Sequence, residues 1–148
     1  MNDKTKARAI RMLDKRDYAR QELINKLVEK GEAEEDAAEV ADRFTELGII
    51  DDERYSALLV RHYAAKGYGA SRIKTELYRR GIDKDLWDAA LEEMPEQDDT
   101  IDRFLATKLK GSIDAKDIKR ASDALLRRGF SWEEIRSALV RYKSDLED

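Results

Sequence analysis

Residues 48–82 read GIIDDERYSALLVRHYAAKGYGASRIKTELYRRGI, and this stretch determines the fold because both of its neighbours repeat parts of it. A shift of 50 residues superposes Gly31 on Gly81, and a shift of 48 residues superposes Gly81 on Gly129. Apolar and basic positions before each glycine superpose as well. A period of ~50 residues, with a glycine at the end of a helix in each copy, is typical of stacked helical modules.

The composition favours a folded helical protein without reactive side chains. Hydrophobic residues make up 41% of the 148 residues and charged residues 42%, as in slender bundles with much exposed surface. The chain has no cysteine, and His62 is its single histidine, so thiol chemistry and histidine clusters are excluded. No run approaches the ~20 apolar residues of a membrane span, and MNDKTKARAI lacks the apolar core of a signal peptide. We therefore expect a cytoplasmic protein without metal or cofactor.

The net charge of −4 conceals alternating blocks of charge. Residues 32–54 hold ten acids and two bases, and residues 83–102 hold nine acids and one base. Residues 61–81 hold six bases and one acid, and residues 103–128 hold eight bases and three acids. This pattern favours a surface that docks on a patterned protein partner, although ordinary solvated helix faces would give the same blocks.

Apolar residues recur at helical spacing along the whole chain, which predicts an all-α fold. Each helix has one apolar stripe and must bury it against others, so we expect nine helices in three tandem three-helix bundles with an elongated, curved arrangement. Asp17 is the expected N-cap of the second helix. The expected modules are residues 1–48, 49–95 and 96–148, and four of the expected helices are 4–15, 34–47, 53–66 and 70–80.

The helix over residues 70–80 carries the candidate binding residues. Arg72 and Arg79 lie seven residues apart, nearly opposite the apolar stripe that contains Leu77, so both are expected to be exposed. The repeat places Arg120 and Arg127 at the matching positions of the third module. These four arginines are the first candidates for partner binding. The remaining candidates are basic or aromatic residues of the second module: Arg54, Tyr55, Arg61, Lys66 and Lys74.

Two motifs that resemble catalytic or ligand sites have simpler explanations. Asp51 and Asp52 come at the expected start of a helix, where capping and the helix dipole favour acids without any metal ion. The GYG of residues 67–69 lacks the preceding strand and the spacing of a phosphate-binding loop, so a turn between helices is the better interpretation. No nucleophile with an orienting base can be named, which makes an enzyme the least favoured class.

Residues 48–82, with the preceding helix YARQELINKLVEKG at 18–31, resemble the RecX family of bacterial regulators of the RecA recombinase. The similarity runs through DDERY, GYGASRI and RGI in that order, and FLATKLKG and LLRRGFSWEEI match the third repeat. It implies tandem three-helix repeats that lie in the groove of the RecA filament on DNA. Such proteins block filament growth and hinder strand exchange and repressor cleavage.

The resemblance favours a non-enzymatic monomer that binds the RecA filament and contacts no membrane. A helical DNA-binding protein is the alternative, because arginines along helices also bind phosphates. The sequence pI of about 5.3 argues against DNA binding as the main activity. Weak direct contact with DNA beside RecA is compatible with both functions.

Overall fold

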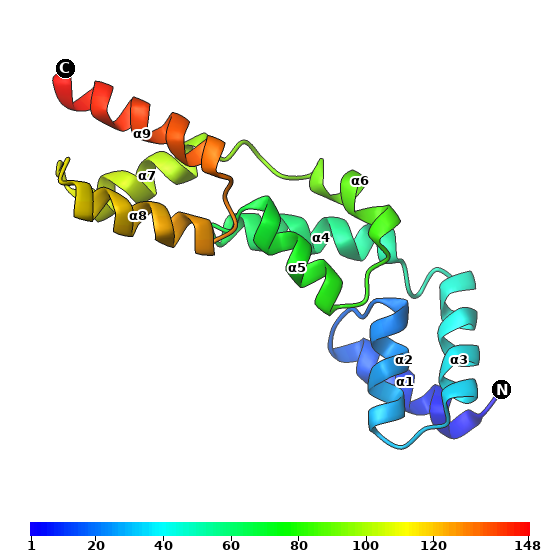
Figure 1. Cartoon of the computed structure of the whole chain (residues 1–148). Coiled ribbons are helices and arrows are strands. Elements are labelled where there is room, and N and C mark those ends of the chain that lie inside the picture. The colour runs from blue at the N-terminus through cyan, green and yellow to red at the C-terminus, as the bar shows by residue number, and fades with distance from the viewer. The chain divides into compact units, whose positions relative to one another are not determined.

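The computed structural model describes residues 1–148 and contains nine α-helices and no β-strand (Figure 1). The all-α prediction is therefore confirmed. The helices are α1 (Asp3–Lys15), α2 (Arg20–Glu29), α3 (Glu34–Glu46), α4 (Asp52–Ala65), α5 (Ala70–Arg79), α6 (Trp87–Leu91), α7 (Asp98–Leu109), α8 (Ala115–Arg127) and α9 (Trp132–Glu147), with a short 3₁₀ helix at Lys84–Leu86 before α6.

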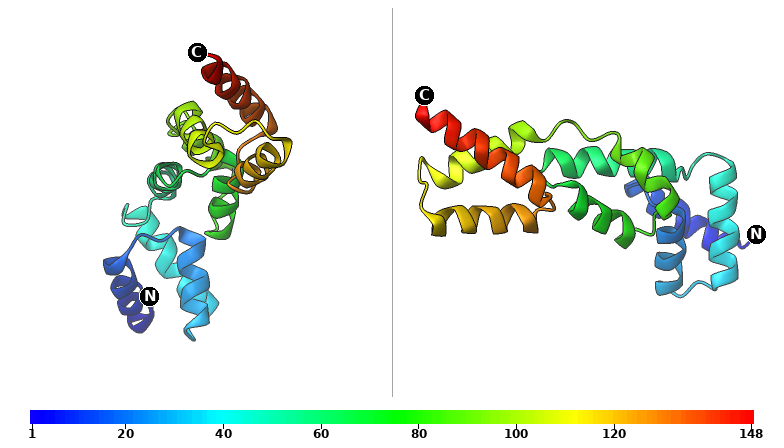
Figure 2. Two further views of the ribbon diagram at one scale, coloured as in Figure 1. Left: turned by 90° about the vertical axis from the view of Figure 1, so that its left-hand side faces the viewer. Right: turned by 45° about the horizontal axis from the view of Figure 1, so that its top comes forward.

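Helices α1, α2 and α3 pack around one hydrophobic core. Leu23 and Leu27 of α2 and Val40 of α3 are 0% exposed, and Phe44 is 2% exposed. These residues and Met12 of α1 belong to a single buried cluster. Figure 2 shows the three helices packed together from two further sides. Each helix has only one apolar stripe, so the core forms only when all three are present.

Helices α7, α8 and α9 enclose a second core of the same kind. Ile101 and Leu105 of α7, Leu125 of α8 and Ile135 of α9 have no exposed surface. The last helix begins with a capping box, in which Ser131 Oγ accepts from the backbone N–H of Glu134. The reciprocal bond runs from the Ser131 N–H to the Glu134 carboxylate, so both orphan donors at this helix start are satisfied.

The prediction that Asp17 caps α2 is wrong. The residue before α2 is Ala19, and the Glu22 carboxylate accepts from the Ala19 N–H at 3.2 Å. Asp17 instead accepts a hydrogen bond through its backbone carbonyl from the Arg16 guanidinium at 2.7 Å. Glu22, the third residue of α2, therefore caps the start of the helix in place of Asp17. The pattern of polar residues could not distinguish the two positions.

Glycines end the repeated helices in the same manner. At Gly81 the backbone has φ +71°, its N–H donates to Tyr78, and the N–H of Ile82 donates back to Leu77. Gly129, with φ +98°, closes α8 with the equivalent pair of bonds. These are Schellman motifs, which require a left-handed residue and therefore favour glycine.

The chain folds into two compact units. The first comprises Met1–Leu59 and Glu76–Glu92, and the second comprises Val60–Thr75 and Glu93–Asp148. Helices α4 and α5 therefore each contribute residues to both units. The expected boundaries at residues 48 and 95 and the elongated arrangement stay predictions.

Within the second unit, the turn before α5 is joined to the turn after α8 through the backbone. Gly69 donates its N–H to the Arg128 carbonyl at 2.8 Å, and Ser71 donates to the Gly129 carbonyl at 3.1 Å. A Cβ at Gly69 would collide with the backbone of Gly129 and Phe130. Only glycine permits this approach, so GYG is a packing element, in agreement with its interpretation as a turn.

Replacing Leu77 by Ala should lower the free energy of unfolding by about 2–5 kcal/mol, because Leu77 is 0% exposed. The control is Thr75→Ala on the same helix, where the side chain is exposed and the expected loss is under about 0.5 kcal/mol. Thermal or denaturant unfolding of the two variants measures the difference. Equal losses would contradict the observed orientation of α5.

Candidate partner-binding surface

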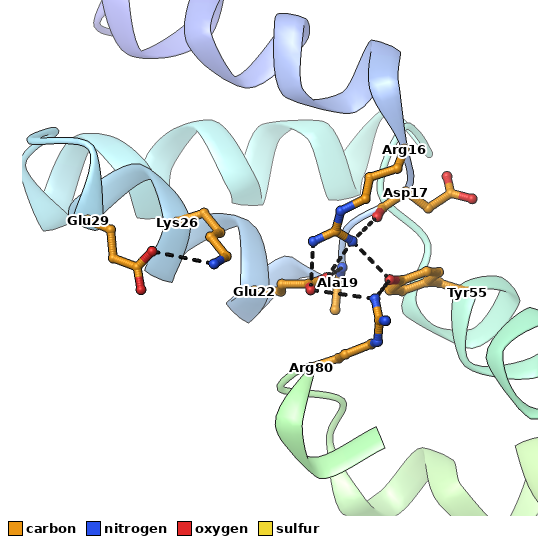
Figure 3. A network of polar contacts seen from close by, with 8 residues as sticks. All are labelled: Arg16, Asp17, Ala19, Glu22, Lys26, Glu29, Tyr55 and Arg80. Atoms are coloured by element: carbon orange, nitrogen blue, oxygen red, sulfur yellow. Dashed lines mark hydrogen bonds and ion pairs between the residues drawn. The ribbon is translucent and has the colours of Figure 1, made fainter. Parts of the chain in front are cut away.

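The first unit holds a network of polar side chains around Glu22 (Figure 3). The Arg16 guanidinium donates to the Glu22 carboxylate at 3.0 Å, and Arg80 lies 3.8 Å from the same carboxylate. The Tyr55 hydroxyl accepts from Arg80 at 2.7 Å and from Arg16 at 3.2 Å. The network therefore connects α2 with the start of α4 and the end of α5.

The low exposure of this network strengthens its electrostatics. Tyr55 is 8% exposed, and the Glu22 side chain is 11% exposed. Burial and then the Glu22 charge raise the pKa of Tyr55, and the two arginines only partly oppose this. Burial acts against the charge of Arg16, but its hydrogen bond and attraction to Glu22 outweigh that cost, so the pKa of Arg16 is raised. Glu22 is thus the carboxylate that pairs with both the Arg16 and the Arg80 guanidinium groups.

A second bond joins the same segments. The Asp52 carboxylate accepts from the backbone N–H of Arg20 at 2.9 Å, and burial raises the pKa of Asp52. Asp51 accepts from the N–H of Arg54 at 3.1 Å at the start of α4. One aspartate therefore caps its own helix and the other binds the start of α2. No group of three or more acidic or histidine side chains could hold a metal ion.

A polar groove of ≈ 490 Å³ adjoins the network. This volume lies within the range of ordinary ligand clefts. Three carboxylates and four cations line it, without a nucleophile beside a base. A groove with both signs of charge can accept the charged side chains of another protein. The lining residues are Arg16, Glu22, Asn25, Lys26, Glu29, Glu76, Arg79 and Arg80.

Three of the four arginines predicted to bind a partner are exposed. The Arg79 side chain is 65% exposed, lines the groove, and lies 3.3 Å from Glu76. Arg120 and Arg127 are exposed on α8. Asp123, which could have neutralised Arg127, lies 3.0 Å from Lys119 instead.

The expectation that Arg72 is fully exposed is wrong. Arg72 is half-buried, and its guanidinium carbon lies 5.0 Å from the centre of the Tyr68 ring. A Cβ on Gly129 would collide with the backbone and Cβ of Arg72. Helical periodicity placed this residue opposite the stripe of Leu77, but it could not reveal that the turn after α8 covers that side.

The other predicted binding residues occupy different surroundings. Arg54 and Lys74 are exposed, and Arg61 forms an ion pair with Glu93 at 3.1 Å. The ammonium group of Lys66 lies 5.9 Å from the centre of the Tyr63 ring. Tyr55, expected as part of an outer surface, is buried in the network. His62 is exposed.

Comparison with known proteins identifies the family. Family models for the first and the second three-helix domain of RecX match residues 6–44 and 51–91. Regulatory protein RecX of Xanthomonas axonopodis pv. citri is 38% identical over 145 residues, which cover 95% of this chain and 87% of the relative. The chain belongs to the RecX family.

Other RecX proteins extend this finding. Regulatory protein RecX of Stenotrophomonas maltophilia (strain R551-3) is 34% identical over 141 residues, which cover 93% of this chain and 86% of the relative. The crystal structure of RecX from Lactobacillus salivarius matches with a TM-score of 0.83 at 23% identity and covers 95% of both chains. That structure supports the fold. No helix of this RecX chain is long and apolar enough to cross a membrane.

Sequence reasoning missed Glu22 and Arg16 as parts of the candidate surface. The repeat aligns Glu22 and Glu29 of the first module with Arg72 and Arg79 of the second. The exchange of charge was itself the signal, because an acid at position 22 can pair with a cation of the next module. The partner, Arg80, became evident only in the structure.

Replacing Glu22 by Gln should lower the free energy of unfolding by about 1–3 kcal/mol, because the hydrogen-bonded anion between Arg16 and Arg80 is lost. The matched control is Glu29→Gln on the same helix. That side chain is 67% exposed and pairs only with Lys26, so the expected loss is under about 0.5 kcal/mol. Urea unfolding measures both values, and equal losses would show that the network does not stabilise the first unit.

Proposed function

We propose that the protein binds the RecA filament on DNA and inhibits its extension, recombinase and coprotease activities without catalysing a reaction. The observation that carries this proposal is the similarity to regulatory RecX proteins along 95% of the chain. On this proposal the protein acts as a cytoplasmic monomer. The groove beside α2 and the exposed arginines supply charged contacts of the kind that such binding needs.

The charge pattern supports a protein partner over a nucleic acid. Each lining cation of the groove lies near a carboxylate, as in the pairs Arg79–Glu76 and Lys26–Glu29. A surface with both signs of charge matches the mixed charges of another protein and fixes its orientation. A continuous phosphate backbone would meet Glu22, Glu29 and Glu76 and be repelled.

Direct contact with single-stranded DNA is the second candidate, and it rests on different residues. The Tyr63 and Tyr68 rings stack with centroids 5.8 Å apart, and Lys66 and Arg72 lie over their faces. Both tyrosines are half-buried. Aromatic rings flanked by cations are the usual platform for unpaired bases. Weak binding of this kind is compatible with a primary role at RecA.

The triple variant Arg79→Glu, Arg120→Glu, Arg127→Glu should fold normally and lose inhibition of RecA. These residues are exposed, and surface substitutions cost under about 0.5 kcal/mol each. Arg72 is left unchanged because it is packed against the turn at Gly129. The measurements are ATP hydrolysis by preformed RecA filaments on single-stranded DNA and co-sedimentation with those filaments.

The matched control is Arg43→Glu, Lys108→Glu, Arg136→Glu, which changes the charge by the same amount at exposed helical positions. It should inhibit as the wild type does. A reaction without RecA separates binding to the filament from binding to DNA. Inhibition by the triple variant at the wild-type dose would exclude these arginines from the interface.

A further inference from the structure

The first unit contains a second groove, distinct from the candidate partner-binding groove beside α2. It has a volume of ≈ 680 Å³ and lies along α1. Arg8, Arg11 and Lys15 are spaced by three and four residues, so they share one face of the helix. Lys30, from the turn after α2, adds a fourth cation.

Arg8 fixes the geometry of this groove. Its guanidinium donates to the Lys30 carbonyl at 2.6 Å and lies 3.6 Å from the Glu32 carboxylate. Glu32 is 7% exposed and also accepts from the Thr5 hydroxyl at 2.9 Å. The charge of Arg8 is therefore largely matched within the module, and its role is to hold α1 beside the turn.

The other three cations have no acidic partner. Arg11, Lys15 and Lys30 are exposed, and none of their side chains forms an ion pair. Asp14 is the single acid among the lining residues. Three unmatched cations around one groove repel one another, so an anionic occupant would relieve a cost that the folded chain otherwise carries.

The floor of the groove is apolar and aromatic. Met12 is 7% exposed, and Tyr18 is half-buried. The Arg16 guanidinium lies 3.6 Å from the centre of the Tyr18 ring and covers one of its faces. The ring is therefore held in place and presents a limited apolar surface. A ligand with both carboxylates and an apolar side chain fits this combination.

A peptide satisfies these conditions better than a nucleic acid. Asp14 interrupts the cations and would repel a phosphate backbone, whereas a peptide can present an N–H donor there. The acidic block of residues 32–54 begins beside Lys30 and carries ten acids. A long polyanion would run into this negative field, whereas a short acidic segment would not.

A second copy of the chain is also a poorer occupant. The repeat places Lys30 at the position of Arg128, whose carbonyl accepts from Gly69 in the contact between turns of the second unit. In the first module the Lys30 carbonyl already accepts from Arg8. A turn from a second copy of the chain therefore cannot dock on the Lys30 carbonyl as the turn at Gly69 docks on Arg128, because Arg8 already donates to that carbonyl.

We propose that the groove formed by Arg11, Lys15 and Lys30 above Met12 and Tyr18 binds a short acidic peptide segment of a partner protein. The carboxylates of the peptide pair with the three unmatched cations, and an apolar side chain lies over Met12 and the free edge of Tyr18. The three unmatched cations of this site lie outside the groove assigned to RecA above, and the proposal does not depend on that assignment.

The test uses the full chain and a short fluorescein-labelled peptide in which glutamates alternate with leucine and phenylalanine. Fluorescence anisotropy should show binding that weakens as salt rises, because the contacts are exposed ion pairs. A peptide with glutamine in place of glutamate should not bind. The double variant Arg11→Glu, Lys15→Glu should bind at least about tenfold more weakly, since two favourable pairs become repulsive.

The matched control is Lys108→Glu, Arg136→Glu, which changes the same charge at exposed positions outside the groove and should bind as the wild type does. Circular dichroism confirms that both variants fold. Equal weakening in both variants, or no binding of the acidic peptide by the wild type, would overturn the proposal. A labelled single-stranded oligonucleotide that binds at this groove in place of the peptide would also overturn it.

Discussion

The ion pairs of Glu22 with Arg16 and Arg80 are the interaction on which the first unit depends. The repeat supplies separate helices, each with one apolar stripe that must be buried against others. The ion pairs and hydrogen bonds around Glu22 join segments of the first and second repeats. The Glu22 carboxylate accepts from the Arg16 guanidinium and forms an ion pair with Arg80 at 3.8 Å, and the Tyr55 hydroxyl accepts from both guanidinium groups. Removing the carboxylate would leave the Arg16 and Arg80 guanidinium groups beside Tyr55 without their shared anion.

In the second unit, segments distant in sequence are joined by backbone hydrogen bonds instead of side-chain ion pairs. Gly69 and Gly129 lack side chains, which allows the turn before α5 to donate two hydrogen bonds to the turn after α8. The equivalent of Gly69 in the first module is Ala19, and the backbone N–H of Ala19 donates to the Glu22 carboxylate. One repeated scaffold therefore carries two chemically different contacts. We infer that this difference concentrates the charged groove in the first unit and leaves α8 with freely exposed arginines.

Much of the fold could be predicted because it follows from local patterns. The apolar stripe of Leu77, the capping box of Ser131 and the glycine at position 81 each act within one helix or one turn. The errors concern contacts between residues distant in sequence. Helical periodicity predicted that Arg72 is exposed, but the turn at Gly129 packs against it. A cap at Asp17 was reasonable locally, but Glu22 takes that role while it also binds Arg16 and Arg80.

Hydrogen–deuterium exchange of the protein with RecA filaments on single-stranded DNA measures whether the groove between α2 and the end of α5 contacts the filament. We expect slower amide exchange in residues 22–29 and 76–80 when filaments are present, with residues 34–46 of α3 as the internal reference. Single-stranded DNA without RecA should leave all three segments unchanged. Slower exchange confined to α3, with residues 22–29 and 76–80 unaffected, would show that the filament does not bind at this groove.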